Sequence, residues 1–458
     1  MSRQFALSPK KSPRIRTKFR SIVTDIPAPK SIPILVRLRK TEPLSMTGQP
    51  PVVWDRAKGF RVFDRWGNCW LDWSSGVLVA SAGHGRDEIV ASIKQVLRKP
   101  LLHSYCFPSE YRAKLTDKIV KLAPVGLDKC FLLTTGAEAV ECVIKISRAF
   151  GQKVGGSNKN IIVTFNGDFH GRTMGSQLAG GSSTLKDWIG PTADKGFVQV
   201  DFPGNIRTKD TSFEGFLKAL ETKGATADRI CLVLPETFQG GSAAFMPIEF
   251  AKKLREWTTA NRIVLGFDEI QAGFGRCGTL WGFQHYDVVP DIFCLGKSIS
   301  GSLPLSAVVG KQELMDLFSP NSMTSTHTGN PVCCAAALAS IHIILKGKLM
   351  QKAAERGRVL HEGLNRVRNK FPHNIAAVQG RGMVAGVHMV KPSGKMEPDP
   401  EAAFDIVERC VERGLLMFAP VGIGSATVKI SPPLVTPNEA ILEGLAVFEE
   451  AVEAVVDN

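Results

Sequence analysis

Short apolar runs recur along the middle of the chain, and a polar residue, a glycine or a proline follows each of them within two positions. The clearest of them occupy residues 161–164, 230–234, 263–267 and 292–295. Runs of this length between such breaks are typical of buried strands. Between the runs, apolar residues recur at helical spacing, for example at 139, 140, 143, 144 and 146. This alternation predicts an α/β protein whose large domain is a mostly parallel sheet, with its site at the carboxyl ends of the strands.

The two ends of the chain follow different patterns. From Val52 to Trp73, short alternating stretches are separated by glycine and Asp-x-x-Gly turns, which predicts a hairpin or meander. The last hundred residues combine predicted helices near 350–370 and 400–413 with a strand near 382–389. We expect these residues to form a smaller domain, because 458 residues suffice for one large domain with a companion.

The net charge of +14 suggests a nucleic-acid partner until it is located along the chain. Residues 1–40 hold eleven Lys or Arg and one acid, Asp25, so most of the excess lies there. The stretch is rich in proline and lacks sustained periodicity, which predicts a flexible, solvated arm or a segment that lies across a partner subunit. Binding to nucleic acid or an anionic membrane, and a mitochondrial transit sequence, are the less favoured alternatives.

The remaining composition is that of an ordinary globular chain, with 44% hydrophobic and 22% charged residues. The ten cysteines include no CxxC pair and no His/Cys cluster at zinc spacing. We therefore expect reduced thiols, no metal and a cytoplasmic location. No apolar run approaches the ~20 residues that a membrane span needs, so no membrane partner is expected.

One lysine carries the candidate chemistry. The apolar run 292–295 ends in Gly296, and Lys297 follows at once. A buried lysine loses its charge or gains a partner, and a lowered pKa makes its amine a nucleophile that can form a Schiff base. A lone Gly-Lys would more often be a surface lysine. Asp268, however, ends another apolar run 29 residues earlier. A lysine that holds an aldehyde and an aspartate that keeps a ring nitrogen protonated together suit pyridoxal phosphate.

Several further motifs occur in the order found in one family. They are Thr134-Thr135-Gly136-Ala137, Phe169-His170-Gly171-Arg172, Glu236-Thr237-Phe238-Gln239-Gly240, Asp268-Glu269-Ile270-Gln271 and Thr326-His327-Thr328-Gly329-Asn330-Pro331. From about Trp54 to the C-terminus the chain resembles the class III (omega) aminotransferases, which are fold-type I pyridoxal phosphate enzymes. The resemblance implies a mostly parallel, seven-stranded-type sheet in the large domain and a small α/β domain built from both termini.

The same resemblance implies domain limits and an assembly. Residues 1–45 would be the basic arm, 46–75 the N-terminal part of the small domain, 76–348 the large cofactor-binding domain and 349–458 the C-terminal small domain. The family forms homodimers, or dimers of dimers, with the active site at the interface. Thr326 matches the hydroxyl that reaches the cofactor phosphate of the neighbouring subunit.

The resemblance also assigns residues to the cofactor. Gly136 and Ala137, at a helix start, would seat the phosphate, because a helix N-terminus favours anions. Phe169 and Ile270 would pack the two faces of the ring, and one of two glutamines would hydrogen-bond its oxygen. The expected cofactor set is Gly136, Ala137, Phe169, His170, Glu236, Gln239, Asp268, Ile270, Gln271, Lys297 and Thr326, with Lys297 and Asp268 as the catalytic residues.

Substrate recognition follows the family less closely. Arg172 and Val77 match positions that face the substrate. Lys429 stands where the family has an arginine that binds the α-carboxylate, and Gly241 replaces a glutamate that partners this arginine. A lysine offers a point charge in place of a planar fork. An aminobutyrate or ornithine substrate is therefore not assigned from the sequence.

These residues predict a pyridoxal phosphate-dependent transamination of a primary amine or ω-amino acid, with pyruvate or 2-oxoglutarate as the acceptor. A racemase or epimerase, an aminomutase and a decarboxylating transaminase would keep the same core residues and are the alternatives within the fold. A non-catalytic protein that binds nucleic acid through the basic arm is the alternative of another class. The intact pair of Lys297 and Asp268 favours the enzyme.

Overall fold

The computed structural model describes residues 3–190 and 196–456. It contains two compact units: unit 1 holds residues 1–86, 241–243 and 351–458, and unit 2 holds residues 87–240 and 244–350. Residues 76–86, which the resemblance assigns to the large domain, cluster with unit 1. Hydrogen bonds to the C-terminal part of unit 1 hold this stretch there. The Ser75 hydroxyl donates to the Ser431 carbonyl at 2.6 Å, and the Leu434 N–H donates to the Ser81 carbonyl at 3.0 Å.

Unit 2 is built on a seven-stranded sheet with the order β6-β12-β11-β10-β9-β7-β8. β12 runs antiparallel to both of its neighbours, and the remaining pairs are parallel. This confirms the predicted α/β fold with a mostly parallel sheet. The strands are β6 (Lys129–Leu133), β7 (Ile161–Phe165), β8 (Phe197–Val200), β9 (Ile230–Val233), β10 (Val264–Asp268), β11 (Ile292–Leu295) and β12 (Ser306–Gly310).

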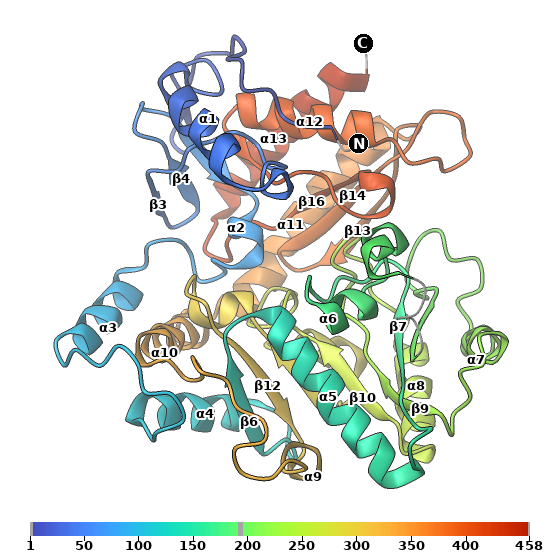
Figure 1. The fold of residues 1–458 in the computed structure, drawn as a ribbon. Helices are drawn as coiled ribbons and strands as arrows, with labels where there is room; N and C mark the ends of the chain where they lie inside the picture. The colour runs from blue at the N-terminus through green and yellow to red at the C-terminus, as the bar shows by residue number, and fades with distance from the viewer. Residues whose placement is uncertain (1–2, 191–195, 457–458) are drawn as a thin grey trace. The chain divides into compact units, whose positions relative to one another are not determined.

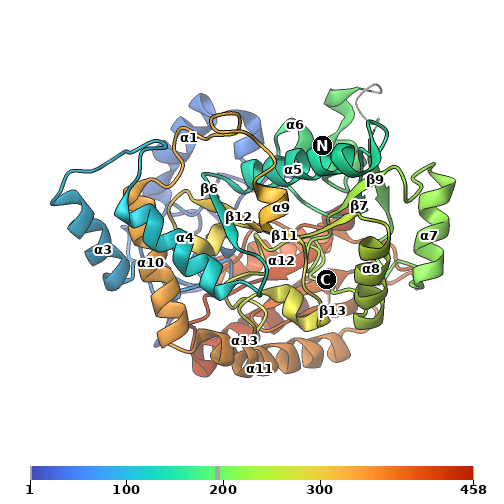
Figure 2. The same cartoon turned by 90° about the horizontal axis from the view of Figure 1, so that it is seen from below.

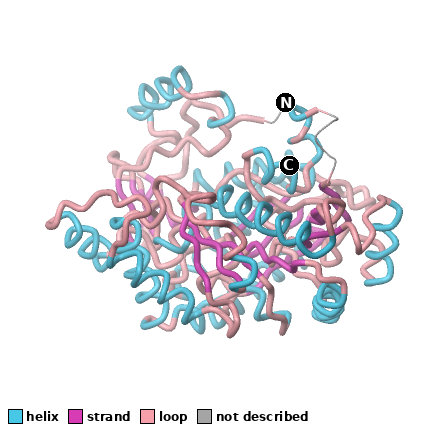
Figure 3. The backbone as a smooth tube through the Cα atoms, turned by 60° about the horizontal axis from the view of Figure 1, so that its bottom comes forward, coloured by secondary structure: helices cyan, strands magenta, loops and turns pink. Residues whose placement is uncertain are grey.

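Helices cover both faces of this sheet. α5 (Gly136–Gly155) lies across one face and α8 (Ile248–Ala260) lies on the other, as Figures 1 and 2 show. Figure 3 shows the strands enclosed by helices. Val143 and Ile146 of α5 are fully buried against Leu232 of β9 and Cys294 of β11. The other helices are α3 (Asp87–Leu97), α4 (Glu110–Leu122), α6 (Met174–Ala179), α7 (Phe213–Thr222), α9 (Gln312–Met315) and α10 (Pro331–Lys346), with short 3-10 helices at Ser183–Leu185, Asp187–Ile189, Gly282–Tyr286 (η5) and Lys297–Ser300 (η6).

Unit 1 contains two sheets and the C-terminal helices. One sheet comprises β1 (Ile15–Arg16), β2 (Ser21–Ile22), β3 (Arg56–Lys58), β4 (Arg61–Phe63), β5 (Cys69–Asp72) and β15 (Leu415–Leu416). The other comprises β13 (Ile375–Arg381), β14 (Val384–Met389) and β16 (Thr427–Ile430). The helices are α1 (Ile32–Thr41), α2 (Ser75–Leu78), α11 (Leu349–Lys370), α12 (Pro400–Glu412) and α13 (Asn438–Val456), with 3-10 turns at Pro29–Ser31, Leu44–Met46 and Ile423–Ser425.

Within residues 3–190 and 196–456, no single helix is both long and apolar enough to cross a membrane. One bent pair, α10 with α11, passes the same test by length and composition.

The basic N-terminal segment, residues 3–26, packs into unit 1, so the expectation of a solvated tail is wrong. Phe5 is 2% exposed, and its ring stacks on that of Phe404 in α12 with the centroids 4.2 Å apart. Ile22 and Ile26 are buried in one apolar cluster with Trp70. The apolar residues of this segment are spaced too irregularly to form a periodic pattern, yet they are enough to anchor it.

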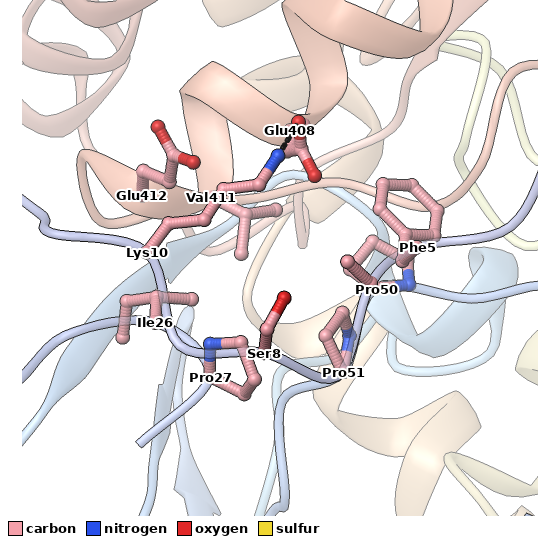
Figure 4. Close-up of a pocket in the computed structure, with 11 residues that line it drawn as sticks. Phe5, Ser8, Lys10, Ile26, Pro27, Pro50, Pro51, Glu408, Val411 and Glu412 are labelled. Atoms are coloured by element: carbon pink, nitrogen blue, oxygen red, sulfur yellow. Dashed lines mark hydrogen bonds and ion pairs between the residues drawn. The ribbon is translucent and has the colours of Figure 1, made fainter. Parts of the chain in front are cut away.

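The basic side chains of the segment pair with acids on α12 and α13. The pairs are Arg3 with Glu401 and Asp405 (2.8 and 2.6 Å), Lys10 with Glu408 (2.6 Å), Lys18 with Glu439 (2.6 Å) and Arg20 with Glu443 (2.7 Å). Figure 4 shows Lys10 reaching Glu408 beside a small, mostly apolar pocket. The local charge excess seen along the sequence is therefore compensated by residues 398 to 423 positions away.

Candidate active site

The carboxyl ends of three neighbouring strands in unit 2 bring the predicted chemistry together. β9, β10 and β11 lie side by side and parallel. Asp268 is the last residue of β10, and Lys297 follows β11. Glu236 follows β9, and its backbone pairs with that of Asp268 in an isolated parallel β-bridge. Because parallel strands end at a common edge of the sheet, residues far apart in sequence converge there.

Lys297 begins η6 in a left-handed conformation, with φ of 44°. This conformation is uncommon for a residue with a side chain, and such residues cluster at functional sites. Burial lowers the pKa of the Lys297 amine, and the negative charges of Asp268 and Glu236 oppose this shift only in part. The neutral, nucleophilic form of the amine is therefore more accessible than in an exposed lysine.

The carboxylate of Asp268 is 4% exposed and is fixed at both oxygens. Oδ1 accepts a hydrogen bond from the N–H of Ile270 at 2.9 Å, and Oδ2 lies 2.9 Å from Nδ1 of His170. Hydrogen bonds of this kind orient a buried carboxylate and hold it in place. Asp268 is thus suited to hold a protonated nitrogen of a bound ring.

His170 is buried between two carboxylates. Its Nδ1 contacts Asp268, and its Nε2 lies 3.5 Å from Oδ2 of Asp168. Burial lowers the pKa of His170, but the hydrogen bonds and charges of Asp168 and Asp268 outweigh this effect and raise the pKa to about 10. The sequence placed His170 among the cofactor residues, and in the structure it contacts Asp268.

The Glu236 carboxylate accepts hydrogen bonds from three segments that lie at the carboxyl ends of the strands. Its Oε2 accepts the N–H groups of Phe169 at 2.9 Å and Gly240 at 2.8 Å, and its Oε1 accepts the amide of Gln271 at 2.9 Å. Burial, with a contribution from the charge of Asp168, raises the pKa of Glu236 to about 8. The predicted residues Phe169, Gln271 and Glu236 therefore belong to one hydrogen-bonded group.

Phe169 and Arg172 remain accessible. The ring of Phe169 is 39% exposed, and the guanidinium carbon of Arg172 lies 5.4 Å from the centre of that ring. Arg172 itself is exposed. An aromatic face with a cation beside it can contact a bound ring and an anionic group at the same time.

The start of α5 has the features of an anion seat. The Thr135 hydroxyl accepts the N–H of Glu138 at 3.2 Å, and the Glu138 carboxylate accepts the N–H of Thr135 at 2.8 Å, which makes a capping box. The other N–H groups of the first turn have no intrahelical acceptor. Gly136 and Gly296 both adjoin Ile270, because a Cβ on either glycine would lie within 3.2 Å of the Ile270 side chain.

Other predicted residues lie elsewhere. The Gln239 amide donates to Asp168 at 3.0 Å and to the Asn166 carbonyl at 2.8 Å, so it supports the turn after β7. Thr326 is exposed on the loop before α10. Val77 and Lys429 belong to unit 1, where Val77 is 44% exposed and Lys429 is 2% exposed. A cofactor contact of Gln239 or Thr326, and a substrate contact of Val77 or Lys429, stay predictions.

Two polar residues received no site role from the sequence. Asp168, two positions before His170, faces the histidine ring. Thr237, which replaces a proline of the family motif, donates its hydroxyl to Glu269, and Glu269 also accepts the N–H groups of Gly282 at 2.7 Å and Phe283 at 2.9 Å. The Asp-x-His spacing was visible in the sequence, but only the fold shows what the two side chains contact.

Known proteins match this chain over most of its length. The family model described as Aminotransferase class-III matches residues 45–452. The 4-aminobutyrate aminotransferase of Mycobacterium leprae is 31% identical over 443 residues, which cover 94% of this chain and 97% of that protein. Ornithine aminotransferase 2 of Staphylococcus aureus is 33% identical over 395 residues, which cover 85% of this chain and 91% of that protein.

A solved structure agrees with these sequence matches. The ornithine aminotransferase of Toxoplasma gondii is similar with a TM-score of 0.82 and 26% sequence identity, covering 93% of this chain and 95% of its own. A second structure of that enzyme is described as having partial occupancy of PLP at its active site.

Proposed function

The chain belongs to the class III aminotransferase family, and from this premise we propose which of its residues carry out the reaction and on which class of substrate. The protein is a pyridoxal phosphate-dependent transaminase. One observation carries the residue assignment. Lys297, with its lowered pKa, and Asp268, with both oxygens fixed, stand at the ends of adjacent parallel strands.

The groups at this sheet edge fit pyridoxal phosphate. The Lys297 amine would hold the aldehyde carbon, Asp268 the ring nitrogen, and the first turn of α5 at Gly136 and Ala137 the phosphate. The fixed orientation of Asp268 and the capping box at Thr135 support these roles, since both leave polar groups ordered before anything binds. When bound, the cofactor supplies a ring that accepts electrons from the carbon next to the substrate nitrogen.

The chain's own residues then have defined tasks. Lys297 Nζ, in its neutral form, would take a proton from the substrate carbon and deliver it to the former aldehyde carbon of the cofactor. Asp268 keeps a proton on the ring nitrogen, because its buried negative charge favours a cation next to it. Phe169 covers the ring through its exposed face, and Glu236 holds the Phe169 backbone in place.

We propose a primary amine or ω-amino acid as the donor and pyruvate or 2-oxoglutarate as the acceptor. The relatives reported above are named for 4-aminobutyrate and ornithine, and the exposed guanidinium of Arg172 supports recognition of a carboxylate on the substrate. A panel of amine donors against the two acceptors tests this assignment. Formation of the amino acid from pyruvate or 2-oxoglutarate is expected, whereas racemisation without any oxo product would contradict it.

A variant tests the role of Lys297. Lys297→Ala should abolish turnover in the panel, because both the attachment of the cofactor and the proton transfer need its amine. Lys311→Ala is the matched control, since Lys311 is another lysine of unit 2 but forms an ion pair with Asp291 at 2.6 Å. A Lys297→Ala protein that turns over at the rate of the control would contradict the assignment.

We also propose a homodimer in which Thr326 contributes to the partner's phosphate site. Three apolar side chains near the start of unit 2, Leu101, Leu102 and Phe107, are 39%, 58% and 73% exposed, which supports their burial in an interface. Analytical ultracentrifugation at micromolar concentration should give twice the chain mass. A monomer that is fully active would contradict the proposal.

A cytoplasmic location is the last part of the proposal. It is supported by the cysteine pattern, which has the spacing of neither a disulfide framework nor a zinc site. Fractionation of cells that express the tagged chain tests it. Recovery of the protein in an organelle or envelope fraction would overturn it.

A further inference from the structure

A second carboxylate stands behind the Asp268–His170 pair. Asp168 lies in the turn after β7, and its Oδ2 is 3.5 Å from Nε2 of His170, while Nδ1 of the same ring is 2.9 Å from Asp268. All three side chains are at most 4% exposed. The histidine ring therefore joins two buried acids that come from different strands.

Asp168 is itself held from behind. Its Oδ2 accepts the N–H of Phe165 at 3.3 Å, and its Oδ1 accepts the amide of Gln239 at 3.0 Å. Gly167 has φ of 91°, and a Cβ at that position would come within 3.2 Å of the Gln239 amide nitrogen. The turn thus needs a glycine to let Gln239 reach Asp168. Burial raises the pKa of Asp168, and the adjacent His170 together with the hydrogen bonds from Gln239 and Phe165 opposes this shift.

The chemistry of the imidazole ring decides how these three groups share protons. A neutral imidazole donates from one nitrogen only and presents a lone pair at the other. In this site each nitrogen faces a carboxylate, so a neutral ring would direct a lone pair at an acid oxygen. The protonated ring donates from Nδ1 to Asp268 and places its second N–H 3.5 Å from Asp168. Among the described residues this second N–H has no hydrogen-bond partner, so Asp168 acts on it through charge.

We infer that Asp168 is a positioning residue that keeps His170 doubly protonated, so that an imidazolium and not a neutral ring donates from Nδ1 to Asp268. The inference rests on the proposed role of Asp268 toward the cofactor ring nitrogen. Two acids and one imidazolium leave one negative charge for that nitrogen. Without Asp168, His170 gives up its second proton at a lower pH. Its Nδ1–H still donates to Asp268, but the positive charge beside Asp268 then depends on pH.

The other titratable groups near His170 either favour its protonated form or act mainly on Asp268. Glu236, from the end of β9, adds negative charge that also favours the imidazolium, and the Glu236 and His170 charges influence each other. Lys297 and the Cys294 thiol interact with Asp268. Gln239, on the far side of Asp168, is neutral. The acids that face His170 therefore outnumber the cations among these groups.

The first test reads the histidine ring directly. In the full-length protein labelled at its histidine ring nitrogens, the His170 signals should remain those of an imidazolium from pH 6 to pH 8.5, with the assignment made by their loss in His170→Gln. In Asp168→Asn the pKa of His170 should fall by about two, because one opposing charge is removed. A neutral His170 at pH 7 in the unmodified protein would overturn the inference even if the variant does not fold.

Asp201→Asn is the matched control for this test. Asp201 makes the same change of charge and shape, accepts a hydrogen bond from Asn166 of the same turn at 2.7 Å, and is exposed. Its variant should leave the His170 titration where it is. An equal fall of the His170 pKa in both variants would show a general charge effect and would contradict a specific role for Asp168.

The second test uses the cofactor-loaded protein. The visible absorbance band should show one more titration, near pH 8, in Asp168→Asn than in the unmodified protein, because the charge of His170 acts on the cofactor through Asp268. A role of Asp168 in packing alone would lower the yield of folded protein without adding a titration. If the unmodified protein binds no cofactor, the proposed function fails, while the histidine titration still decides the role of Asp168.

Discussion

The two units use charged residues in different ways. In unit 2, Asp168, His170, Glu236 and Asp268 are all at most 4% exposed and lie at one sheet edge, where His170 contacts both aspartates. In unit 1, several of the pairs between the N-terminal segment and α12 or α13 face water, such as Lys18 and Glu439, whose side chains are both 70% exposed. Arg20 and Glu443, at 12% and 19%, are the exception. Water and salt screen exposed pairs strongly and buried groups weakly. Charge should therefore control the reaction in unit 2 and matter little for the stability of unit 1.

Replacement of the central acid of unit 2 should give the largest effect. Asp268→Asn keeps the shape of the side chain but removes the negative charge that holds a proton on the cofactor ring. Turnover should fall by about a hundredfold to a thousandfold, the range found when one preorganised electrostatic group is removed. Steady-state kinetics with the donor chosen from the panel measure this, and Glu439→Gln in unit 1 is the control, which should retain the original rate.

A buried acid of unit 2 should also make stability depend on pH. Burial raises the pKa of Glu269 from 4.5 to about 7, against the hydrogen bonds from Thr237, Gly282 and Phe283. Between these two values the folded protein binds more protons than the unfolded chain, so the free energy of unfolding falls as pH rises through this window and levels off above it.

The size of this effect follows from the shift. Glu269→Gln should remove a pH-dependent loss on the order of 3 kcal/mol between pH 4.5 and pH 7, as measured by urea unfolding at several pH values. The two proteins are compared by how steeply the free energy of unfolding changes with pH and not by its absolute value. The reason is that a glutamine at 269 also alters the hydrogen bonds to Thr237, Gly282 and Phe283. Parallel pH profiles of the two proteins would show that Glu269 is not the source.

In unit 1, removal of an apolar anchor should cost more than removal of a charge. Phe5→Ala deletes a ring that is 2% exposed and stacked on Phe404, so the loss should be about 3 kcal/mol in the free energy of unfolding. Val23→Ala, in the same segment but 45% exposed, is the control and should change the urea midpoint little. Equal effects of the two substitutions would mean that the segment is not held by its buried side chains.

The smallest effect should come from an exposed ion pair. Lys18→Gln removes the charge that faces Glu439 at 2.6 Å, but both side chains are largely in water. The urea midpoint should stay within the error of the measurement, at low salt and at 1 M NaCl alike. A clear, salt-sensitive loss of stability would contradict the account, because it would show that this exposed pair stabilises unit 1.

Much of unit 2 could be predicted because its signals are local. Two apolar runs that became strands have their functional residue at or just past the strand end: Asp268 is the last residue of β10, and Lys297 follows β11 after one glycine. The sheet and its order then bring these strand ends together. Family resemblance supplied the cofactor, which the lysine and the aspartate alone only suggest.

The contacts that escaped prediction join residues far apart in the sequence. His170 and Asp268 are 98 positions apart, and the position of Asp168 on the far side of the ring depends on how β7 and β10 pack in the sheet. The N-terminal segment was misjudged for the same reason, since Lys10 finds Glu408 398 positions later. A count of charges over forty consecutive residues does not include the acids that only the fold brings next to them.

The most direct test of the account is chemical marking of Lys297. The full-length protein is loaded with pyridoxal phosphate, reduced with borohydride, digested and mapped by mass spectrometry. The account predicts a pyridoxyl group on the peptide that contains Lys297 and none on the peptide that contains Lys311. An unmodified Lys297 in protein that has retained the cofactor, or a mark on a different lysine, would contradict it.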